Sequence, residues 1–332
     1  MFNIFKNKTV LITGGTGSFG KKFIDNVLKT TKVKKIIIYS RDEQKQFQIQ
    51  KLYKNSNLRF FIGDIRDKSR LEFATREVDY IIHAAALKHV EISEYNPFEF
   101  VKTNIIGSQN VIDCAIQNNV KKVLALSTDK ASSPLNLYGS TKLTADKLFV
   151  SANNFKGLKD IKFSVVRYGN VMGSRGSVIP LFIKQKDKNI FTITDKSMTR
   201  FNITLTESVD FVIQSLTKMI GGEIFVPKIK SYKIMDLVKA ISAKPKIKLI
   251  GKRSGEKIHE EMISEFESSN SIENKNFFVI LPNSKYNTLS KRSYLKKFKN
   301  AKSLKKNFSY NSLNNKFLTI KELKKILNLY SS

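Results

Sequence analysis

Residues 127–142 contain the side chains of this chain that are best suited to acid–base chemistry. The stretch reads STDKASSPLNLYGSTK, and its last part places Tyr138 and Lys142 four residues apart. On a helix this spacing puts both side chains on one face. Because an ammonium beside a phenol favours the phenolate, we expect Lys142 to lower the pKa of Tyr138, and Tyr138 to act as a base toward a hydroxyl group. Taken alone, the Y-x-x-x-K pattern is equally typical of an ordinary amphipathic helix.

Three further candidates, Thr128, Asp129 and Lys130, follow directly after the apolar run VLALS. A lysine acts as a base only when it is neutral, so we expect burial beside Lys142 to lower the pKa of Lys130 from about 10.4 to roughly 7–8. Burial raises the pKa of a carboxyl group, and we therefore expect Asp129 to keep its proton and act as an acid. The alternative is a surface ion pair between Asp129 and Lys130, with Thr128 ending the strand.

The elements that must position these groups begin with a glycine-rich turn. Residues 8–13 predict a buried strand, which runs directly into the sequence GGTGSFG. Gly14 and Gly17 permit a tight turn close to a pyrophosphate, and Gly20 lets the following helix pack against the strand. The free N–H groups at the start of that helix attract a phosphate. The strand before this turn and the helix after it predict a dinucleotide site.

The cofactor preference is predicted from the end of the second strand, residues 35–40. Sites for NAD usually carry an acid there for the ribose 2′-hydroxyl, whereas sites for NADP need a cation near the 2′-phosphate. Arg41 is the first charged residue after the strand, so we predict NADP. The alternative is that Arg41 pairs with Asp42 on the surface. A third strand at 58–62 is expected to bring Asp64 near the adenine.

Further strands and helices alternate along the chain. Residues 79–83 predict a fourth strand, and the small residues that begin with Ala84 let the backbone pass close to the cofactor while Lys88 faces the site. We then expect a long helix at 96–118, a fifth strand at 121–127 and a sixth at 161–168. The fifth strand delivers residues 127–142 at its carboxyl end, which is where open parallel sheets bind ligands.

This pattern predicts an α/β fold, a Rossmann-type doubly wound parallel sheet with a smaller C-terminal substrate-binding domain. The cofactor domain is expected to comprise residues 1–168 with a return segment at about 200–226, and the substrate domain residues 169–199 and 227–332. In the C-terminal part we expect helices at 202–219, 232–242 and about 319–329, a short strand at 222–227 and irregular structure at 285–315. The basic loop 251–259 could hold a diphosphate.

The composition limits the possible partners. The 332 residues carry 59 Lys and Arg against 28 Asp and Glu, a formal charge of +31. The lysines are spread along the chain without a nucleic-acid-binding motif, so we expect a lysine-rich surface and no nucleic acid partner. Cys114 is the only cysteine, no apolar run is long enough to span a membrane, and no histidine has a second ligand at metal-binding spacing. We expect a soluble cytoplasmic protein without a metal site.

Motifs along nearly the full length resemble the extended short-chain dehydrogenase/reductase family. Within that family the chain resembles the inverting UDP-N-acetylglucosamine 4,6-dehydratases, which begin pseudaminic acid synthesis. The segments most specific to this branch are the TDK triplet, MTRF at 198–201 and GEKIHEEMI at 255–263. The other matching segments are TGGTGSFG at 13–20, YSRDE at 39–43, FFIGDIRD at 60–67, HAAALKHV at 83–90, LYGSTKL at 137–143, LFVSANNFKG at 148–157, VVRYGNVMGSRGSV at 165–178, GGEIFVPKI at 221–229 and FSYNS at 308–312.

The resemblance implies a role for each matching residue. The catalytic residues are expected to be Thr128, Asp129, Lys130, Tyr138 and Lys142. The residues expected to contact NADP are Gly14, Thr16, Gly17, Ser18, Phe19, Gly20, Ser40, Arg41, Asp42, Glu43, Gln44, Lys45, Asp64, Ile65, Ala84, Tyr138, Lys142, Val171, Met172, Gly173, Ser174 and Arg175. The residues expected to contact the UDP-sugar are Lys88, Asn170, Val178, Thr194, Arg253 and Tyr310. The chain departs from the family at Ser254, where proline is usual, which frees the loop without removing Arg253. The family also suggests a homo-oligomer of six copies.

The implied reaction is the 4,6-dehydration of UDP-N-acetylglucosamine by a hydro-lyase. Hydride transfer from C4 to NADP⁺ makes the C5 hydrogen acidic, water leaves across C5 and C6, and the hydride returns to C6. Tyr138 is expected to be the base at O4, Lys130 the base at C5 and Asp129 the acid for the C6 hydroxyl. Similar dehydratases that retain the C5 configuration carry TDE where this chain has TDK, so inversion is predicted. The alternatives are a UDP-N-acetylhexosamine 4-epimerase, which needs no acid–base pair at C5 and C6, and a non-catalytic NADP- or polyanion-binding protein.

Overall fold

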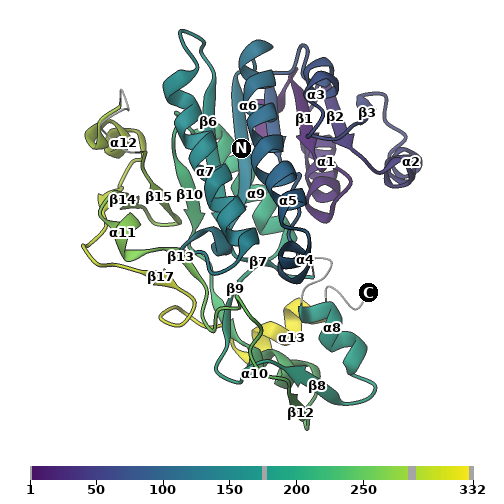
Figure 1. Cartoon of the computed structure of the whole chain (residues 1–332), viewed down its shortest axis with the longest axis vertical. Coiled ribbons are helices and arrows are strands. Elements are labelled where there is room, and N and C mark those ends of the chain that lie inside the picture. Colours follow the sequence, from purple (N-terminus) through teal and green to yellow (C-terminus); the bar gives the residue numbers. More distant parts are fainter. Residues whose placement is uncertain (1, 174–177, 283–288, 329–332) are drawn as a thin grey trace.

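The apolar runs form the strands of one large twisted sheet (Figure 1). The structure is a computed structural model that describes residues 2–173, 178–282 and 289–328. All six strands predicted for the first half are present, each within one residue of its predicted bounds. They are β1 (Thr9–Thr13), β2 (Lys35–Ser40), β3 (Leu58–Ile62), β4 (Tyr80–His83), β5 (Lys122–Thr128) and β6 (Lys162–Tyr168). Within these ranges the central strands are buried on both faces, which explains why they are continuously apolar rather than alternating.

The order of the strands confirms the predicted Rossmann-type sheet. Its parallel part runs β3-β2-β1-β4-β5-β6 and is extended by β10 (Ile224–Pro227) alongside β6. The order reverses between β1 and β4, so ligands are expected above the carboxyl ends of these strands. Three antiparallel strands continue the sheet beyond β10: β15 (Phe277–Ile280), β14 (Ser271–Glu273) and β16 (Lys302–Ser303). The predicted division placed these three strands in the substrate domain, whereas the structure pairs them with the large sheet.

Helices cover both faces of this sheet. One face packs against α1 (Ser18–Thr30) and α9 (Leu205–Lys218), and the other against α3 (Lys68–Ala74), α6 (Gly107–Gln117) and α7 (Leu137–Phe155), with α2 (Glu43–Leu52) at the β2–β3 edge. Alternate residues of each central strand feed the two cores: Val10 and Ile12 lie in one, and Leu11 in the other. In Figure 1, α6 and α7 cross the front of the sheet.

Several predicted boundaries differ from the observed ones for local reasons. The helix predicted at 96–118 consists of α5 (Pro97–Phe100), a π-helical segment at 101–106 and α6. The helix predicted from residue 202 begins only at Leu205, because Thr204 and Glu207 form a capping box and Asn202 belongs to β9 (Thr199–Ile203). The helix predicted at 232–242 is preceded by β11 (Ser231–Lys233) and spans Ile234–Ile241 (α10). The segment predicted to be irregular contains α12 (Lys291–Lys297), β16 and β17 (Tyr310–Asn311).

A smaller lobe lies below the carboxyl edge of the sheet in Figure 1. Its core is formed by α8 (Val178–Gln185), α10 and α13 (Ile320–Asn328), packed around the strand pair β8 (Ile190–Ile193) and β12 (Lys246–Leu249). The strands β7 (Asn170–Val171), β9 and β11 form a second small sheet, and β13 (Glu261–Ile263) pairs with β17. The remaining short helices are η1 (Phe2–Phe5), α4 (Val90–Tyr95), η3 (Asp129–Ala131) and α11 (Glu265–Ser268). The small lobe therefore faces the edge at which the TDK triplet emerges.

A buried ion cluster ties β6 to its neighbours. Arg167 is fully buried, and its guanidinium lies 3.3 Å from Asp146 on α7 and 2.9 Å from Glu267 on α11. We expect Arg167→Met to lower the free energy of unfolding by about 3–5 kcal/mol, because it leaves two carboxylates without their cation. Denaturant unfolding measures this. The control is Lys162→Met on the same strand as Arg167, which removes an ion pair with the exposed Asp160 just before β6 and should cost under about 1 kcal/mol. Equal losses in both variants would contradict the assignment.

Candidate active site

The glycine turn between β1 and α1 has the geometry of a phosphate cradle. Gly14 has a φ of +66°, and a Cβ there would lie 2.9 Å from the backbone of Ala85. A Cβ on Gly20 would lie 2.2 Å from the carbonyl oxygen of Gly15, so the close packing of α1 on β1 requires glycine. Gly17 shares the tight turn with Gly14, as predicted, because its N–H donates to the carbonyl oxygen of Gly14 at 3.0 Å. Its φ of −74° is ordinary, and it serves as the N-cap of α1. The turn needs its left-handed residue at Gly14 alone.

A cavity of about 190 Å³ opens at this turn. It is lined by Thr16, Gly17, Ser18, Lys21 and Lys45. Four of these residues were predicted to contact the cofactor, whereas Lys21, one turn into α1, was not. Two lysines beside the N-terminus of a helix form a suitable environment for the phosphates of a dinucleotide.

The residues at the end of β2, which were predicted to contact the cofactor, differ in their contacts and exposure. Asp42 caps α2 through the backbone N–H of Lys45 and also pairs with the Lys45 ammonium. Arg41 keeps 55% of its side chain exposed and lies 3.6 Å from Asp64, so its acidic partner is not Asp42. Burial raises the pKa of Asp64, but hydrogen bonds from Arg66 outweigh this and lower it overall. Glu43 and Gln44 lie in the first turn of α2, and Ser40 accepts a hydrogen bond from Gln46.

The loop after β4 is held by groups on both sides. The Thr13 hydroxyl accepts hydrogen bonds from the backbone N–H groups of Ala84 and Ala85. On the other side, Asn104 bonds both the N–H and the C=O of Leu87 at 2.9 Å. Asn104 belongs to the π-helical segment, an arrangement that often marks functional sites, and its role was not predicted from the sequence. The pKa of Lys88 is lowered, first by burial and then by the positive charge of Lys130.

The TDK triplet forms a short helical turn directly after β5. Asp129 is completely buried, and its Oδ1 accepts hydrogen bonds from the Thr128 hydroxyl at 2.9 Å and from the Lys130 ammonium at 3.0 Å. Lys130 Nζ also donates to Asn170 Oδ1 at 3.2 Å. The Lys130 side chain is 23% exposed, so the pair is largely enclosed between the two lobes and is not a surface ion pair. As predicted, burial raises the pKa of Asp129.

The predicted pKa of Lys130 is wrong in direction. Burial alone lowers the pKa, but the charges of Asp129 and Glu260 outweigh burial and raise it above its ordinary value. The prediction considered the cation Lys142 as the neighbour, whereas the structure surrounds the ammonium with two carboxylates. In this state Lys130 is protonated.

The predicted effect of Lys142 on Tyr138 is also not observed. Both residues lie on α7 and are buried, but Lys142 Nζ donates to the carbonyl oxygen of Leu126 at 2.8 Å. Burial raises the pKa of Tyr138 to about 12, against the smaller lowering effects of the Lys130 charge and the Thr128 hydroxyl. Burial also lowers the pKa of Lys142. The phenol is therefore protonated here, with Thr128 and Lys130 as its polar neighbours.

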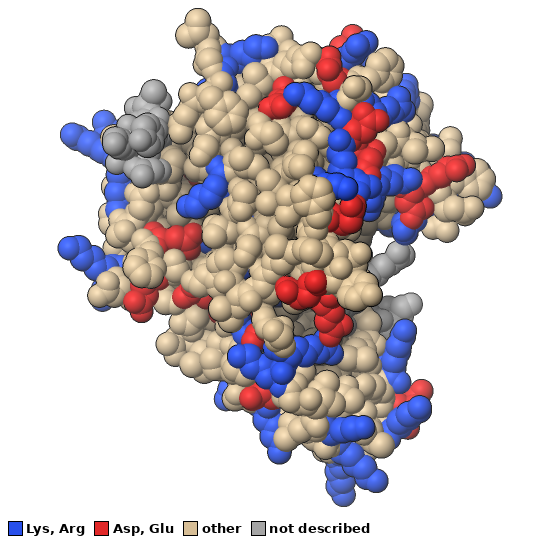
Figure 2. Space-filling view, viewed as in Figure 1, with Lys and Arg blue, Asp and Glu red and all other residues tan. Residues whose placement is uncertain are grey.

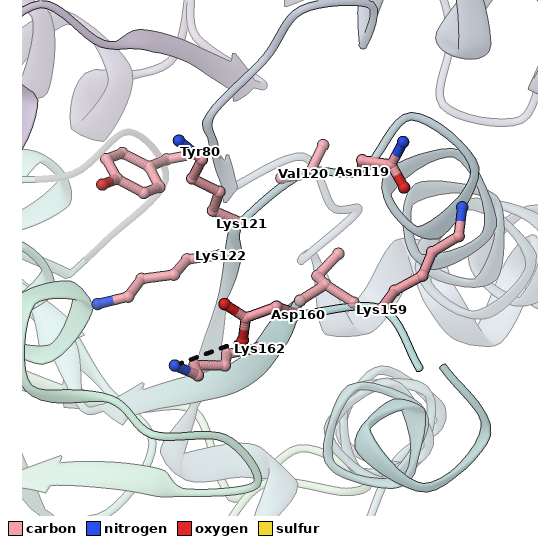
Figure 3. Close-up of a pocket in the computed structure, with 9 residues that line it drawn as sticks. Tyr80, Asn119, Val120, Lys121, Lys122, Lys159, Asp160 and Lys162 are labelled. Atoms are coloured by element: carbon pink, nitrogen blue, oxygen red, sulfur yellow. Dashed lines mark ion pairs between the residues drawn. The ribbon is translucent and has the colours of Figure 1, made fainter. Parts of the chain in front are cut away.

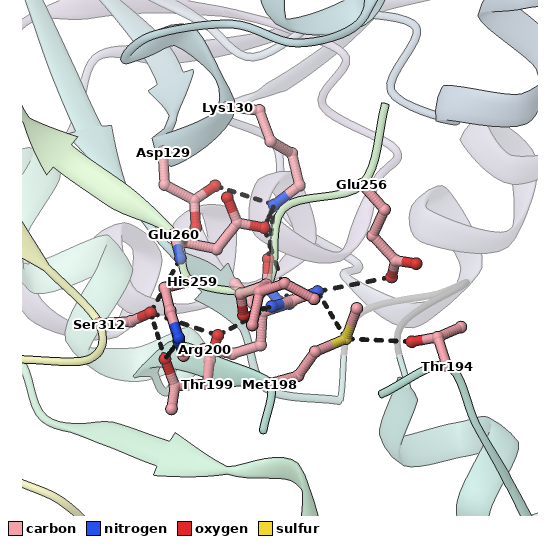
Figure 4. A network of polar contacts seen from close by, with 12 residues as sticks. Asp129, Lys130, Thr194, Met198, Thr199, Arg200, Glu256, His259, Glu260 and Ser312 are labelled. Carbon is pink, nitrogen blue, oxygen red and sulfur yellow. Dashed lines mark hydrogen bonds and ion pairs between the residues drawn. The ribbon is translucent and has the colours of Figure 1, made fainter. Parts of the chain in front are cut away.

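Two charged residues from the smaller lobe complete the cluster, and neither was assigned a role from the sequence (Figure 4). Glu260 Oε1 lies 3.2 Å from Lys130 Nζ and 3.6 Å from Arg200 Nε. Arg200 also lies 3.4 Å from Glu256. Burial raises the pKa of Glu260, but Lys130 and Arg200 outweigh this and lower it overall. Arg200 lies in the branch-specific segment MTRF and Glu260 in GEKIHEEMI, and membership of these segments was the sequence feature that could have indicated their role.

The other residues predicted to contact substrate are more scattered. The Thr194 hydroxyl donates to Met198 Sδ at 3.0 Å, and Arg253 lies on the surface 2.9 Å from Glu91. The Tyr310 hydroxyl is occupied by the backbone N–H and C=O of Ile229. Of the predicted contacts, Ile65 is buried beside α6, Val171 and Met172 follow Asn170, Gly173 has a φ of +72°, and Val178 begins α8. Ser174 and Arg175 lie outside the described residues.

A second cavity, of about 380 Å³, lies at the opposite edge of the sheet (Figure 3). Four lysines line it, but their ammonium groups already have partners. Lys122 donates to the carbonyl oxygen of Leu216, Lys159 to that of Ile116, and Lys121 and Lys162 pair with Asp79 and Asp160. Because each ammonium group has a protein partner, we interpret these four lysines as structural residues.

Charge on the described surface is dispersed. Figure 2 shows Lys and Arg side chains spread over both lobes and interleaved with acids. Within residues 2–173, 178–282 and 289–328, no helix is long and apolar enough to cross a membrane. In the same ranges no three His, Cys, Asp or Glu side chains are grouped to hold a metal ion.

A Rossmann-type sheet with a phosphate cradle and a buried Tyr-Lys pair beside it defines the short-chain dehydrogenase/reductase class. Residues 10–282 match the family described as polysaccharide biosynthesis protein, and the chain belongs to this family. It is 52% identical over 330 residues to the UDP-N-acetylglucosamine 4,6-dehydratase (inverting) of Campylobacter jejuni, covering 98% of both chains. It is 40% identical to the UDP-glucose 4-epimerase of Rickettsia felis, covering 98% of this chain and 96% of that protein.

The fold has a close structural relative. The structure of Pen from Bacillus thuringiensis is 41% identical, covers 98% of this chain and 99% of its own, and superposes with a TM-score of 0.89. The dTDP-glucose 4,6-dehydratase DesIV from Streptomyces venezuelae, with NAD bound, shares the fold at 23% identity and a TM-score of 0.67, covering 75% of this chain and 86% of its own.

Proposed function

We propose that this protein catalyses the NADP-dependent 4,6-dehydration of UDP-N-acetylglucosamine with inversion at C5. The observation that carries the proposal is the Asp129–Lys130 pair beside Tyr138, with Asp129 fully buried, at the carboxyl edge of a Rossmann-type sheet. The 52% identity over 98% of both chains to an inverting dehydratase supports the choice of substrate and product. The product would be the 4-keto-6-deoxy sugar of the L-arabino configuration. From the resemblance to the family we also propose that the protein forms a homo-oligomer.

The residues present fit a nicotinamide cofactor, which supplies a hydride acceptor for C4 and later a hydride donor for C6. Lys21 and Lys45 beside the start of α1 would hold its phosphates. Tyr138 takes the proton from O4, and the charge of Lys130 and the hydroxyl of Thr128 favour the phenolate. Lys130 takes the C5 proton once C4 is a ketone. Burial raises the pKa of Asp129, which favours the protonated form that gives its proton to the departing C6 hydroxyl.

The decisive experiment is NMR of the product formed by purified protein with NADP⁺ and UDP-N-acetylglucosamine in D₂O. The expected product has lost water, is inverted at C5 and carries solvent deuterium there. A freshly quenched product of the D-xylo configuration would instead assign the retaining reaction. UDP-N-acetylgalactosamine without loss of water would assign a 4-epimerase, and the absence of any conversion would refute the proposal.

The cofactor preference gives a separate prediction. Arg41 is exposed and lies 3.6 Å from Asp64, so its guanidinium can reorient toward a 2′-phosphate. We expect the protein to bind NADP more tightly than NAD. Arg41→Ala should lower the ratio of the two affinities by about tenfold, because it removes one charge-assisted contact worth about 1.5 kcal/mol. Calorimetric titration with both cofactors measures this. Arg59→Ala, an arginine on β3 bonded only to nearby carbonyl oxygens, is the control. Equal affinity of the unmodified protein for both cofactors would contradict the assignment.

A further inference from the structure

Glu260 is a buried carboxylate for which the proposed reaction has so far no use. Its side chain is only 4% exposed, and its Oε1 is shared by Lys130 Nζ at 3.2 Å and Arg200 Nε at 3.6 Å. Within the described residues, its Oε2 is buried without a hydrogen-bond partner, and the same holds for Asp129 Oδ2. Among the described residues, both carboxylates that contact the Lys130 ammonium therefore keep one buried oxygen without a partner. This costs free energy in a purely structural salt bridge, because a carboxylate stabilises a fold only when its lone pairs are satisfied.

The charges around this group come from both lobes. Lys130 is influenced by Asp129 and Glu260, which favour its charged form, and by Arg200, which opposes it. Glu260 is influenced by three cations: Lys130, Arg200 and Lys257. Lys88, Tyr138 and Tyr232 lie close enough for the charge of Lys130 to lower the pKa of each. Of these groups, Glu260 and Asp129 are the two acceptors that contact the Lys130 ammonium directly.

We propose that Glu260 is a positioning residue that holds the Lys130 ammonium in the resting site and accepts its proton when Lys130 acts as a base. The inference rests on the proposed function, because it assigns Lys130 as the base at C5. It also resolves the conflict between that role and the protonated Lys130 of this structure.

The proton transfer is balanced within the pair. An N–H bond of Lys130 breaks and an O–H bond forms on Glu260, so that an ammonium and a carboxylate become an amine and a carboxylic acid. The freed lone pair of Lys130 then takes the C5 proton. Two conditions favour this transfer. A proton on Asp129 removes one of the two negative charges that hold the Lys130 ammonium, and exclusion of water by a bound substrate disfavours charged groups.

The first test measures the charge state of Lys130 without any turnover. Competitive labelling with acetic anhydride over a range of pH, followed by mass spectrometry of the peptide that contains Lys130, gives the pH at which this amine becomes reactive. Because Glu260 favours the ammonium, Glu260→Gln should shift that pH downward by at least about one unit. Glu261→Gln is the matched control, since the neighbouring carboxylate bonds Ser132, Ser133 and Ser309 instead. An unchanged labelling profile in Glu260→Gln would overturn the inference.

The second test measures the reaction. In Glu260→Gln, Lys130 must lose its proton to solvent, so the rate of C5 deuterium exchange should fall on the order of 100-fold near pH 7. The loss should shrink as the pH rises toward about 10, where an ordinary lysine becomes neutral. Glu260→Asp restores an acceptor and should recover part of the rate. A rate equal to or above that of the unmodified protein in Glu260→Gln would overturn the inference, since Glu260 would then only restrain Lys130.

The two tests separate this inference from the proposed function. If the unmodified protein does not convert UDP-N-acetylglucosamine, the proposed function fails, and the labelling profile alone decides whether Glu260 controls the charge of Lys130. If Glu260→Gln does not fold, Glu260→Asp is compared with Glu261→Asp in the same labelling measurement. The shorter side chain moves the carboxylate away from Lys130, so a smaller downward shift is expected, and no shift would overturn the inference.

Discussion

Lys130→Met should abolish exchange of the C5 hydrogen with solvent and net dehydration, while hydride transfer from C4 to the cofactor persists. The methionine side chain fills a similar volume but cannot accept a proton, so the reaction should stop at the 4-keto sugar. The expected loss of dehydration is at least about 100- to 10,000-fold, the usual contribution of a general base. The readouts are the NMR spectrum of the product in D₂O and the absorbance of reduced cofactor in a single turnover.

Lys88→Met is the matched control, because Lys88 is a second lysine near the site, and its pKa is affected by the charge of Lys130. As a predicted substrate contact it should weaken substrate binding yet leave C5 exchange measurable at saturating substrate. Normal dehydration in Lys130→Met would remove Lys130 from the C5 step. The TDK triplet would then no longer predict inversion at C5.

Tyr138→Phe should remove hydride transfer almost completely while leaving cofactor binding nearly intact. The variant deletes only the hydroxyl that accepts the proton from O4, and the phenyl ring keeps its packing against Phe100. Because no later step can begin before C4 is oxidised, C5 exchange should be lost as well, by about 100- to 10,000-fold. Cofactor titration and single-turnover absorbance measure the two effects separately.

Tyr168→Phe serves as a control, since Tyr168 is also buried and belongs to β6, next to the strand that carries Thr128. It should retain most of the activity. Turnover close to normal in Tyr138→Phe would exclude this tyrosine as the base. Loss of cofactor binding in the same variant would instead show that the hydroxyl holds the dinucleotide.

The parallel part of the sheet and the position of the candidate site along the chain could be predicted from the sequence alone. Strands of a doubly wound sheet are buried on both faces, so their apolar runs are continuous and end abruptly at glycines or charged residues. The positive φ of Gly14 and the contact of Gly20 with the carbonyl oxygen of Gly15 are set by backbone geometry within a few residues. The placement of the TDK triplet after β5 and of Tyr138 on the next helix follows from the same local order. Such features depend on neighbours in the chain and can be predicted without the fold.

The charge state of the site could be established only from the tertiary structure. The pKa of Lys130 depends on which charges lie within a few ångströms, and Glu260, 130 residues away in the chain, is one of them. The sequence suggested Lys142 as the influential neighbour, but the fold directs that ammonium to the carbonyl oxygen of Leu126. The sheet extension by β14, β15 and β16 was missed for a similar reason, because pairing at an edge depends on where distant segments return. Long-range pairing and buried charge are thus properties of the folded chain rather than of any local pattern.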